Sequence, residues 1–114
     1  MIKVIHEDVY ETKTIFVYNC SVEEANKVFK KYKCKEIPNT VDGNYEAANI
    51  YEKLIYISDI KNINVLVHEV MHLVFNILTE RGIYLNYGEE QINDEPFTYL
   101  VGYYFKSLKK EYEA

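Results

Sequence analysis

The sequence predicts a single α+β domain over residues 1–114, in which helices pack against an antiparallel or mixed sheet. Segments rich in β-branched and aromatic residues alternate with segments in which apolar residues recur at helical spacing. The chain has 48% hydrophobic and 27% charged residues, an ordinary globular balance. At this length it can build one hydrophobic core without a disulfide framework.

The first part of the chain is predicted to contain two strands followed by a helix. Residues 2–6 and 14–19 are rich in β-branched and aromatic side chains and flank a mostly polar stretch, which is typical of a hairpin. Ser21 and Glu24 then have the spacing of a capping box, so a helix begins there. Apolar residues at helical spacing continue this helix to about Tyr32.

The rest of the chain is predicted to contain a second pair of strands and two helices. Residues 45–50 and 53–58 have the composition of strands and follow a stretch rich in turn-forming residues. The last helix starts at a cap formed by Asn93 or Asp94, and Pro96 is compatible with its first turn. The expected order is therefore β-β-α-β-β-α-α, with one helix in the N-terminal half and two in the C-terminal half.

The first of the two C-terminal helices is unusually apolar. We expect it over residues 63–81, with Asp59 or Asn62 as its cap and Gly82 as its stop signal. Apolar residues lie almost all round it, so the helix is predicted to be buried. Its polar residues form a narrow stripe along the helix: His68, Glu69, His72, Asn76 and Glu80.

This stripe contains the pattern His-Glu-x-x-His. His68 and His72 project from one helix face about one turn apart, which is the geometry that two ligands of one tetrahedral zinc require. Glu69 is placed to act as general base on a zinc-bound water without ligating the metal. The alternative is that both histidines are hydrogen-bonded core residues. That arrangement is costly, because two buried imidazoles and a carboxylate would need partners without a metal.

A third protein ligand is expected downstream of the motif. Phe75 and Leu78 stand where the metzincin pattern has glycine and a third histidine, so that subclass is excluded. The acidic residues that follow the motif are Glu80, Glu89, Glu90, Asp94 and Glu95.

Among these acids we choose Glu95 as the third ligand. Thr98 and Gly102 share its helix face and are small enough to let the last helix approach the metal helix closely. Asp94 is the competing ligand. It lies nearer the larger apolar stripe on the other side of that helix, which consists of Phe97, Leu100, Val101, Tyr104 and Leu108. The alternative is that Glu95 binds no metal and is an acidic residue in the first turn of the helix, where it interacts favourably with the helix dipole.

Three stretches of the chain resemble gluzincin-type HExxH metallopeptidases. They are LVHEVMH at residues 66–72, GI at 82–83 and DEPFTYL at 94–100. The chain is similar to short zincin-like proteins encoded in phage and prophage genomes and, more distantly, to ImmA/IrrE-type peptidases. The resemblance covers about residues 54–105 and implies a small zincin-like domain.

The resemblance implies that His68, His72 and Glu95 ligate zinc and that Glu69 is the catalytic base. The first function to consider is a zinc metallopeptidase that hydrolyses a peptide bond in a cytoplasmic protein, in the host cytoplasm if the chain is phage-encoded. The second is a zinc-stabilised, non-catalytic binding protein on a zincin scaffold, such as a phage-encoded inhibitor of a host factor. A domain of this size offers only a shallow substrate groove, which keeps the second function open, although we favour the peptidase.

Composition restricts the partners and the compartment. The net charge is −5 and the lysine clusters belong to no nucleic-acid motif, which disfavours a nucleic-acid partner. No segment has the apolar length of a signal peptide or a membrane span, so we expect a cytoplasmic protein. Cys20 and Cys34 fit no zinc-ribbon spacing and are expected to be free thiols, with one disulfide as the alternative.

The predicted strand at residues 53–58 leads directly into the metal helix. We expect this strand, or the strand paired with it, to form a sheet edge beside His68. An extended peptide substrate could add to such an edge through main-chain hydrogen bonds.

Overall fold

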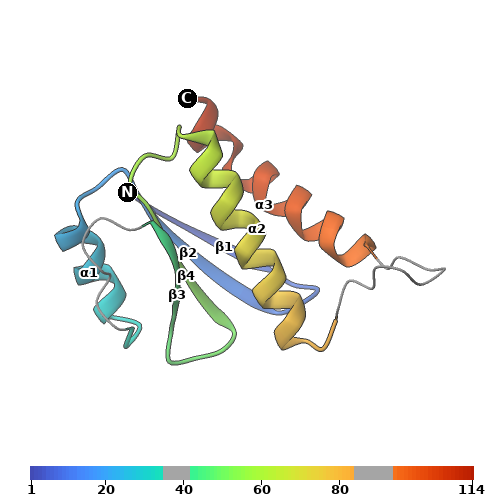
Figure 1. Ribbon diagram of the computed structural model, residues 1–114. Coiled ribbons are helices and arrows are strands. Elements are labelled where there is room, and N and C mark those ends of the chain that lie inside the picture. Colours follow the sequence, from blue (N-terminus) through green and yellow to red (C-terminus); the bar gives the residue numbers. More distant parts are fainter. Residues whose placement is uncertain (35–41, 84–93) are drawn as a thin grey trace.

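The computed structural model describes residues 1–34, 42–83 and 94–114. Within them the chain forms four strands and three helices in the predicted order (Figure 1). The elements are β1 (Ile2–Glu7), β2 (Thr12–Tyr18), α1 (Val22–Lys30), β3 (Gly43–Glu46), β4 (Glu52–Ile57), α2 (Ile63–Glu80) and α3 (Glu95–Glu113). The predicted α+β class is confirmed.

The four strands form one mixed sheet in the order β1-β2-β4-β3. β1 and β2 pair antiparallel, β2 and β4 pair parallel, and β3 pairs antiparallel with β4. β4 is therefore an interior strand, and its partner β3 is the strand at the end of the sheet. α2 and α3 lie on one face of this sheet and α1 lies on the other (Figure 1).

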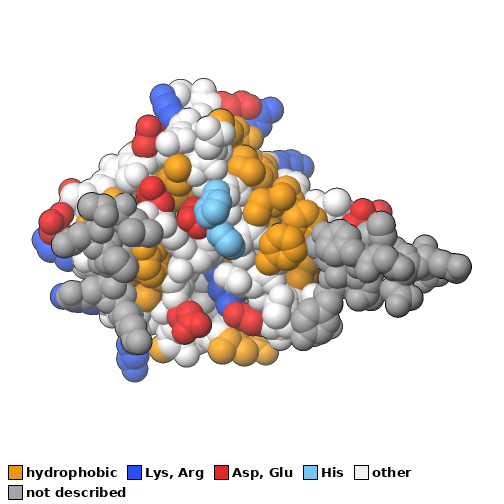
Figure 2. Space-filling view, in the orientation of Figure 1, with side chains coloured by type: hydrophobic (Ala, Val, Ile, Leu, Met, Phe, Trp, Pro, Cys, Tyr) orange, Lys and Arg blue, Asp and Glu red, His pale blue; other side chains and the backbone are white. Residues whose placement is uncertain are grey.

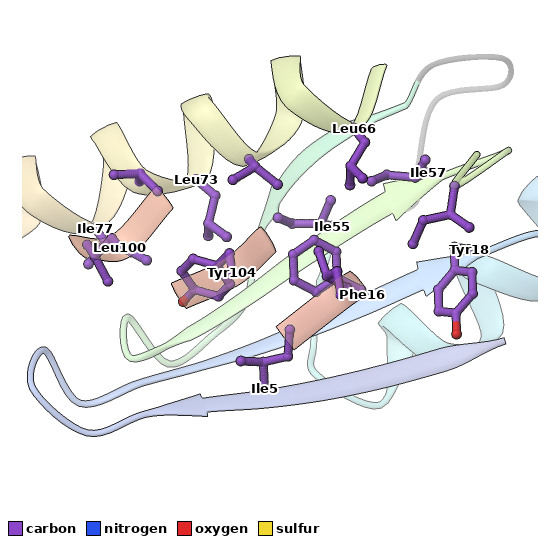
Figure 3. Close-up of a cluster of buried hydrophobic side chains, with 14 of the residues drawn as sticks. Ile5, Phe16, Tyr18, Ile55, Ile57, Leu66, Leu73, Ile77, Leu100 and Tyr104 are labelled. Carbon is purple, nitrogen blue, oxygen red and sulfur yellow. The ribbon is translucent and has the colours of Figure 1, made fainter. Parts of the chain in front are cut away.

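The sheet carries a hydrophobic core on each face because its central strands are buried on both sides. Ile55 and Ile57 of β4 face α2 and α3, where they pack with Leu66 and Leu73 (Figure 3). The alternate residues of β4 point the other way and pack with Phe29 of α1. A strand with two buried faces appears in sequence as a continuous apolar run, as residues 54–57 of β4 do.

β3 begins and ends earlier than the sequence suggested. The predicted strand over residues 45–50 is wrong beyond Glu46, since residues 48–51 form a bend and turn before β4. Asn49 causes the reversal: its Oδ1 accepts the Tyr51 N–H (2.9 Å) and its carbonyl oxygen accepts the Glu52 N–H (3.0 Å). An asparagine side chain that accepts from the backbone two residues on is a typical turn former.

Both ends of α2 follow local signals. Asn62 provides the cap, and its Oδ1 accepts the Val65 N–H at 3.4 Å. At the other end Gly82 has a φ of +75°, a conformation that side chains disfavour. The Gly82 N–H donates to the Thr79 carbonyl and the Ile83 N–H donates to that of Leu78. This pair of bonds is a Schellman motif, so Asn62 and Gly82 set the bounds of the helix.

The outer face of α2 is exposed, which contradicts the prediction that the helix is buried all round. Val67 and Phe75 are 38% and 42% exposed, and His68 and His72 are exposed as well. The sheet covers one side of α2 and α3 covers an adjacent side. In the described part of the chain no third layer covers the remaining face, and the polar stripe opens there to solvent.

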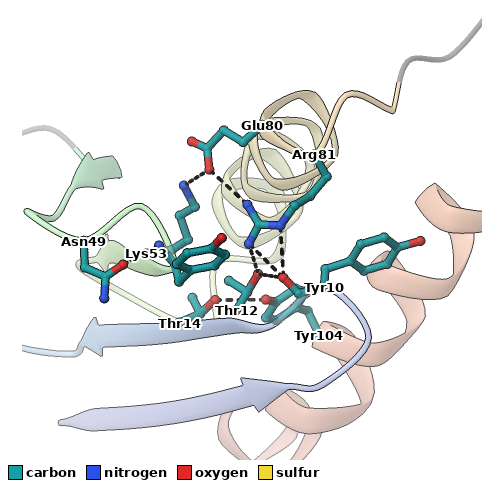
Figure 4. A network of polar contacts seen from close by, with 9 residues as sticks. Tyr10, Thr12, Thr14, Asn49, Lys53, Glu80, Arg81 and Tyr104 are labelled. Carbon is teal, nitrogen blue, oxygen red and sulfur yellow. Dashed lines mark hydrogen bonds and ion pairs between the residues drawn. The ribbon is translucent and has the colours of Figure 1, made fainter.

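Polar contacts fix the C-terminal end of α2 to the sheet (Figure 4). The Arg81 guanidinium donates to the Tyr10 carbonyl oxygen, at 2.8 Å from Nη2, and to the Thr12 hydroxyl at 3.3 Å. Glu80 forms ion pairs with Lys53 of β4 and with Arg81. These bonds connect α2 to both central strands and hold it at a fixed position across the sheet.

Tyr104 of α3 makes a buried polar contact whose loss is expected to destabilise the fold. Its ring is fully buried, and its hydroxyl lies 2.9 Å from the Thr14 Oγ1 of β2. Tyr104→Phe leaves the Thr14 hydroxyl buried without this partner, which costs about 1–3 kcal/mol of unfolding free energy. Urea denaturation measures this loss. Adding Thr14→Val removes the orphaned hydroxyl, so the double variant should lose less than the sum of the two single variants.

Candidate metal centre

His68 and His72 converge on the exposed face of α2. Their Nε2 atoms lie 3.1 Å apart, with ring centroids separated by 4.6 Å and the rings nearly perpendicular at 78°. The histidine side chains occupy the middle of the face shown in Figure 2. Residues four apart lie above one another on a helix, so the convergence follows from the spacing that the sequence shows.

The distance between the two nitrogens suits one metal ion. Two histidine nitrogens bound at 2.0–2.1 Å to a tetrahedral zinc lie about 3.3 Å from each other. The observed 3.1 Å is close to this value. The same distance also permits a direct hydrogen bond between two neutral rings, one as donor and the other as acceptor. Both rings are exposed, so the alternative that they are buried core histidines is wrong.

The Glu69 carboxylate completes the cluster. One ligand atom from each of His68, Glu69 and His72 lies within 4.8 Å of those from the other two. Glu69 is only 5% exposed, in contrast to the two histidines. Its side chain therefore comes to the cluster from the sheet side of α2, while the imidazoles face solvent.

Asn44 of β3 binds Glu69, and the sequence interpretation missed this residue. Its Nδ2 donates to the Glu69 Oε1 at 3.3 Å and to the Glu69 carbonyl oxygen at 3.1 Å. Strand alternation places Asn44 on the face of β3 opposite Tyr45, which packs on Phe29 of α1. Alternation could thus have indicated the side of the sheet, but it carries no information on which helix residue lies opposite.

The expected close approach of α3 to the metal helix through its small residues is wrong. Thr98 and Gly102 are exposed, and a Cβ added at Gly102 would meet nothing within 4 Å. α3 instead packs through its larger stripe, which includes Leu100, Tyr104 and Leu108. The small-residue face of α3 therefore no longer supports Glu95 as a metal ligand.

Glu95 lies apart from the cluster of His68, Glu69 and His72. Its exposed side chain borders a shallow pocket beside the β1–β2 turn, with Val9, Tyr10, Pro96 and Tyr99.

The other candidate acids are not part of the cluster either. Asp94 is the exposed first residue before α3, and Glu80 is engaged by Lys53 and Arg81. Glu89, Glu90 and the candidate cap Asn93 lie outside the described residues. The described residues thus bring together the two histidines and the motif glutamate, without a second carboxylate from downstream.

A pocket of about 270 Å³ lies between α2 and the hairpin of β3 and β4. Asn44 and Asn76 line it, the first bound to Glu69 and the second one helical turn beyond His72. β3 is the end strand of the sheet, so the partner of residues 53–58 forms an edge, and its Asn44 contacts Glu69. That a peptide pairs with this edge stays a prediction.

Two further observations concern the cysteines and the helices. Cys20 and Cys34 form no disulfide, as the sequence interpretation favoured. None of the described helices has both the length and the apolar character needed to cross a membrane.

Comparisons of the chain with protein-family models, with curated proteins and with solved structures found no match.

Proposed function

We propose that this protein is a zinc-dependent metallopeptidase of the HExxH type. The observation that carries the proposal is the convergence of the two imidazole Nε2 atoms, 3.1 Å apart, next to the Glu69 carboxylate. Two nitrogen donors with this separation suit zinc, and a carboxylate held beside them suits proton transfer. The chain's resemblance to gluzincin-type peptidases supports the same assignment.

Each residue has a separate role in this proposal. His68 and His72 hold the metal, and Glu69 takes a proton from the attacking water as general base. Zinc, when bound, supplies Lewis-acid polarisation of the water and of the scissile carbonyl. The substrate is a peptide or protein in the cytoplasm, a compartment that two cysteines without a disulfide suit. The net charge of −5 makes a nucleic-acid substrate unfavourable.

Peptide cleavage that depends on the metal tests this proposal. The zinc-loaded protein is incubated with a mixture of unrelated peptides, and new termini are identified by mass spectrometry. We expect cleavage that a chelator abolishes and added zinc restores. A zinc-loaded protein that leaves all peptides intact, over a range of lengths and sequences, would contradict the peptidase assignment.

Glu95 is proposed as the third ligand on the strength of the sequence resemblance, with Asp94 as its competitor. Glu95 would then hold the zinc together with His68 and His72. Glu95→Ala is expected to weaken zinc affinity on the order of tenfold or more, while Asp94→Ala leaves it unchanged. Competition with a chromophoric chelator measures both affinities. The opposite pattern would assign the ligand to Asp94.

A specific observation favours a second function, a zinc-stabilised and non-catalytic binding protein. Two apolar side chains of α2, Val67 and Phe75, are exposed beside the histidines. The ring of the half-buried Phe97 packs next to Phe75, with 5.0 Å between the ring centroids. Figure 2 shows hydrophobic side chains gathered next to the histidine pair. Exposed apolar patches are typical of protein-binding surfaces. An inhibitor encoded by a phage and directed at a host factor would be one such protein.

A further inference from the structure

The amide side chain of Asn44 is the direct polar link between the end strand of the sheet and Glu69. Its Nδ2 lies 3.1 Å from the Glu69 carbonyl oxygen and 3.3 Å from the Glu69 Oε1. Both acceptors belong to Glu69, one in its backbone and one in its side chain. A side chain anchored at its backbone and at its carboxylate has few orientations left.

The chemistry of the two acceptors fixes the orientation of the amide. A flipped Asn44 would place its Oδ1 against two oxygens that cannot donate when Glu69 is ionised. The NH₂ group has two hydrogens, and the two acceptors of Glu69 can use both. The Asn44 Nδ2 is thereby occupied within the protein, which leaves it unsuited to bind a substrate directly.

We propose that Asn44 is a positioning residue that holds the Glu69 carboxylate beside His68 and His72. This inference rests on the proposed function, in which Glu69 is the general base. A glutamate side chain has several rotatable bonds, and fixing them in one arrangement costs conformational entropy. The amide of Asn44 offsets this cost before substrate arrives, so the carboxylate is already oriented toward the cluster.

The same contact links the substrate edge to the base. Asn44 lies in β3, the end strand of the sheet, and its backbone pairs with Ile55 of β4. A peptide that adds to the outer edge of β3 would order the strand that carries Asn44. The orientation of Glu69 then depends on the same strand that aligns the scissile bond.

Nuclear magnetic resonance tests the contact with the carboxylate, with or without catalysis. Glu69→Ala keeps the backbone carbonyl acceptor and removes the carboxylate. If Asn44 holds the carboxylate, its side-chain amide ¹H–¹⁵N signals should shift in Glu69→Ala. The side-chain amide signals of Asn49, on the same hairpin, should stay in place. Unchanged Asn44 signals would show that Asn44 anchors only the helix backbone, and would overturn the proposal.

Kinetics test the consequence for the reaction. Asn44→Asp keeps the shape but replaces the donor by a carboxylate, and is expected to lower kcat on the order of tenfold to a hundredfold. KM and the zinc content should stay within about twofold, because neither depends on the orientation of the base. Asn49→Asp adds the same charge to the same hairpin without contact with Glu69, and should leave kcat unchanged.

The two experiments separate this inference from the proposed function. A kcat for Asn44→Asp equal to that of the wild type would overturn the positioning role of Asn44, although the peptidase assignment would stand. A wild-type protein that cleaves no peptide would contradict the peptidase assignment. In that case the amide signals of Asn44 in Glu69→Ala still decide whether Asn44 holds the carboxylate.

Discussion

His68→Ala and His72→Ala are each expected to abolish zinc binding. The purified wild-type protein should contain about one zinc per chain, as expected for a site with one pair of histidine ligands. Removing either imidazole leaves one nitrogen donor, and the remaining contacts cannot hold the ion against dialysis. Elemental analysis after dialysis should give a zinc content near zero for both variants.

The structure also supplies the control for this experiment. His6, the third histidine of the chain, lies on β1 and is exposed, outside the cluster. Its carbonyl oxygen accepts the Tyr103 hydroxyl, a bond that His6→Ala retains. His6→Ala should therefore keep both zinc and fold. Zinc retained in His68→Ala, or lost in His6→Ala, would place the metal elsewhere.

The metal-free variants should remain folded. His68 and His72 are exposed, and substitutions at exposed positions usually change the unfolding free energy by less than about 0.5 kcal/mol. Zinc should raise the melting temperature of the wild-type protein, because a ligand that binds only the folded state stabilises it. Neither histidine variant should respond to added zinc. This pair of measurements separates a lost ligand from a lost fold.

Local signals in the sequence were sufficient to indicate the start of α1 and both ends of α2, although they were not sufficient for the ends of β3. Ser21 caps α1 by accepting the Glu24 N–H at 3.2 Å, and its hydroxyl lies 3.3 Å from the Glu24 carboxylate. Asn62 and Gly82 bound α2 in the same way. Each of these effects acts within about one helical turn, so it can be read from neighbouring residues. The convergence of His68 and His72 is local for the same reason.

The packing of α3 could not be predicted because the helix has two plausible contact faces. Thr98 and Gly102 suggested a close approach to α2, whereas Leu100 and Tyr104 offered a larger apolar area. Burial of apolar area contributes about 25 cal/mol per Å², so the large stripe wins unless a specific bond opposes it. The choice of Glu95 as metal ligand relied on the small residues Thr98 and Gly102, which are the weaker of these two packing signals.

The exposure of the histidines depends on how many structural layers cover α2. The sequence of α2 does not carry this information. A helix that is apolar almost all round predicts burial on every side. In this fold the sheet and α3 cover only part of α2, and Val67 and Phe75 stay exposed. Likewise, the contact between Asn44 and Glu69 joins residues 25 apart in sequence. It depends on the order of the strands, with β3 at the end of the sheet.

Glu69→Gln is expected to lower peptide cleavage by a factor on the order of a hundred or more, because it removes the general base. The amide keeps nearly the same shape and can still accept a hydrogen bond from the Asn44 Nδ2 through its carbonyl oxygen. Zinc content, secondary structure and melting temperature should therefore match the wild type. Steady-state kinetics on one cleaved peptide, with zinc measured on the same samples, give the comparison.

The same variant distinguishes the peptidase from the binding protein. A binding surface that uses Val67, Phe75 and Phe97 has no need of a proton acceptor at residue 69, so a binding protein should tolerate Glu69→Gln. Phe75→Ala gives the opposite test, since it removes apolar contact area and leaves the cluster intact. In a cell-based or partner-binding assay, full activity of Glu69→Gln together with loss of activity in Phe75→Ala would reject the peptidase. Loss in Glu69→Gln with zinc retained would support it, because a structural zinc site does not require a free base.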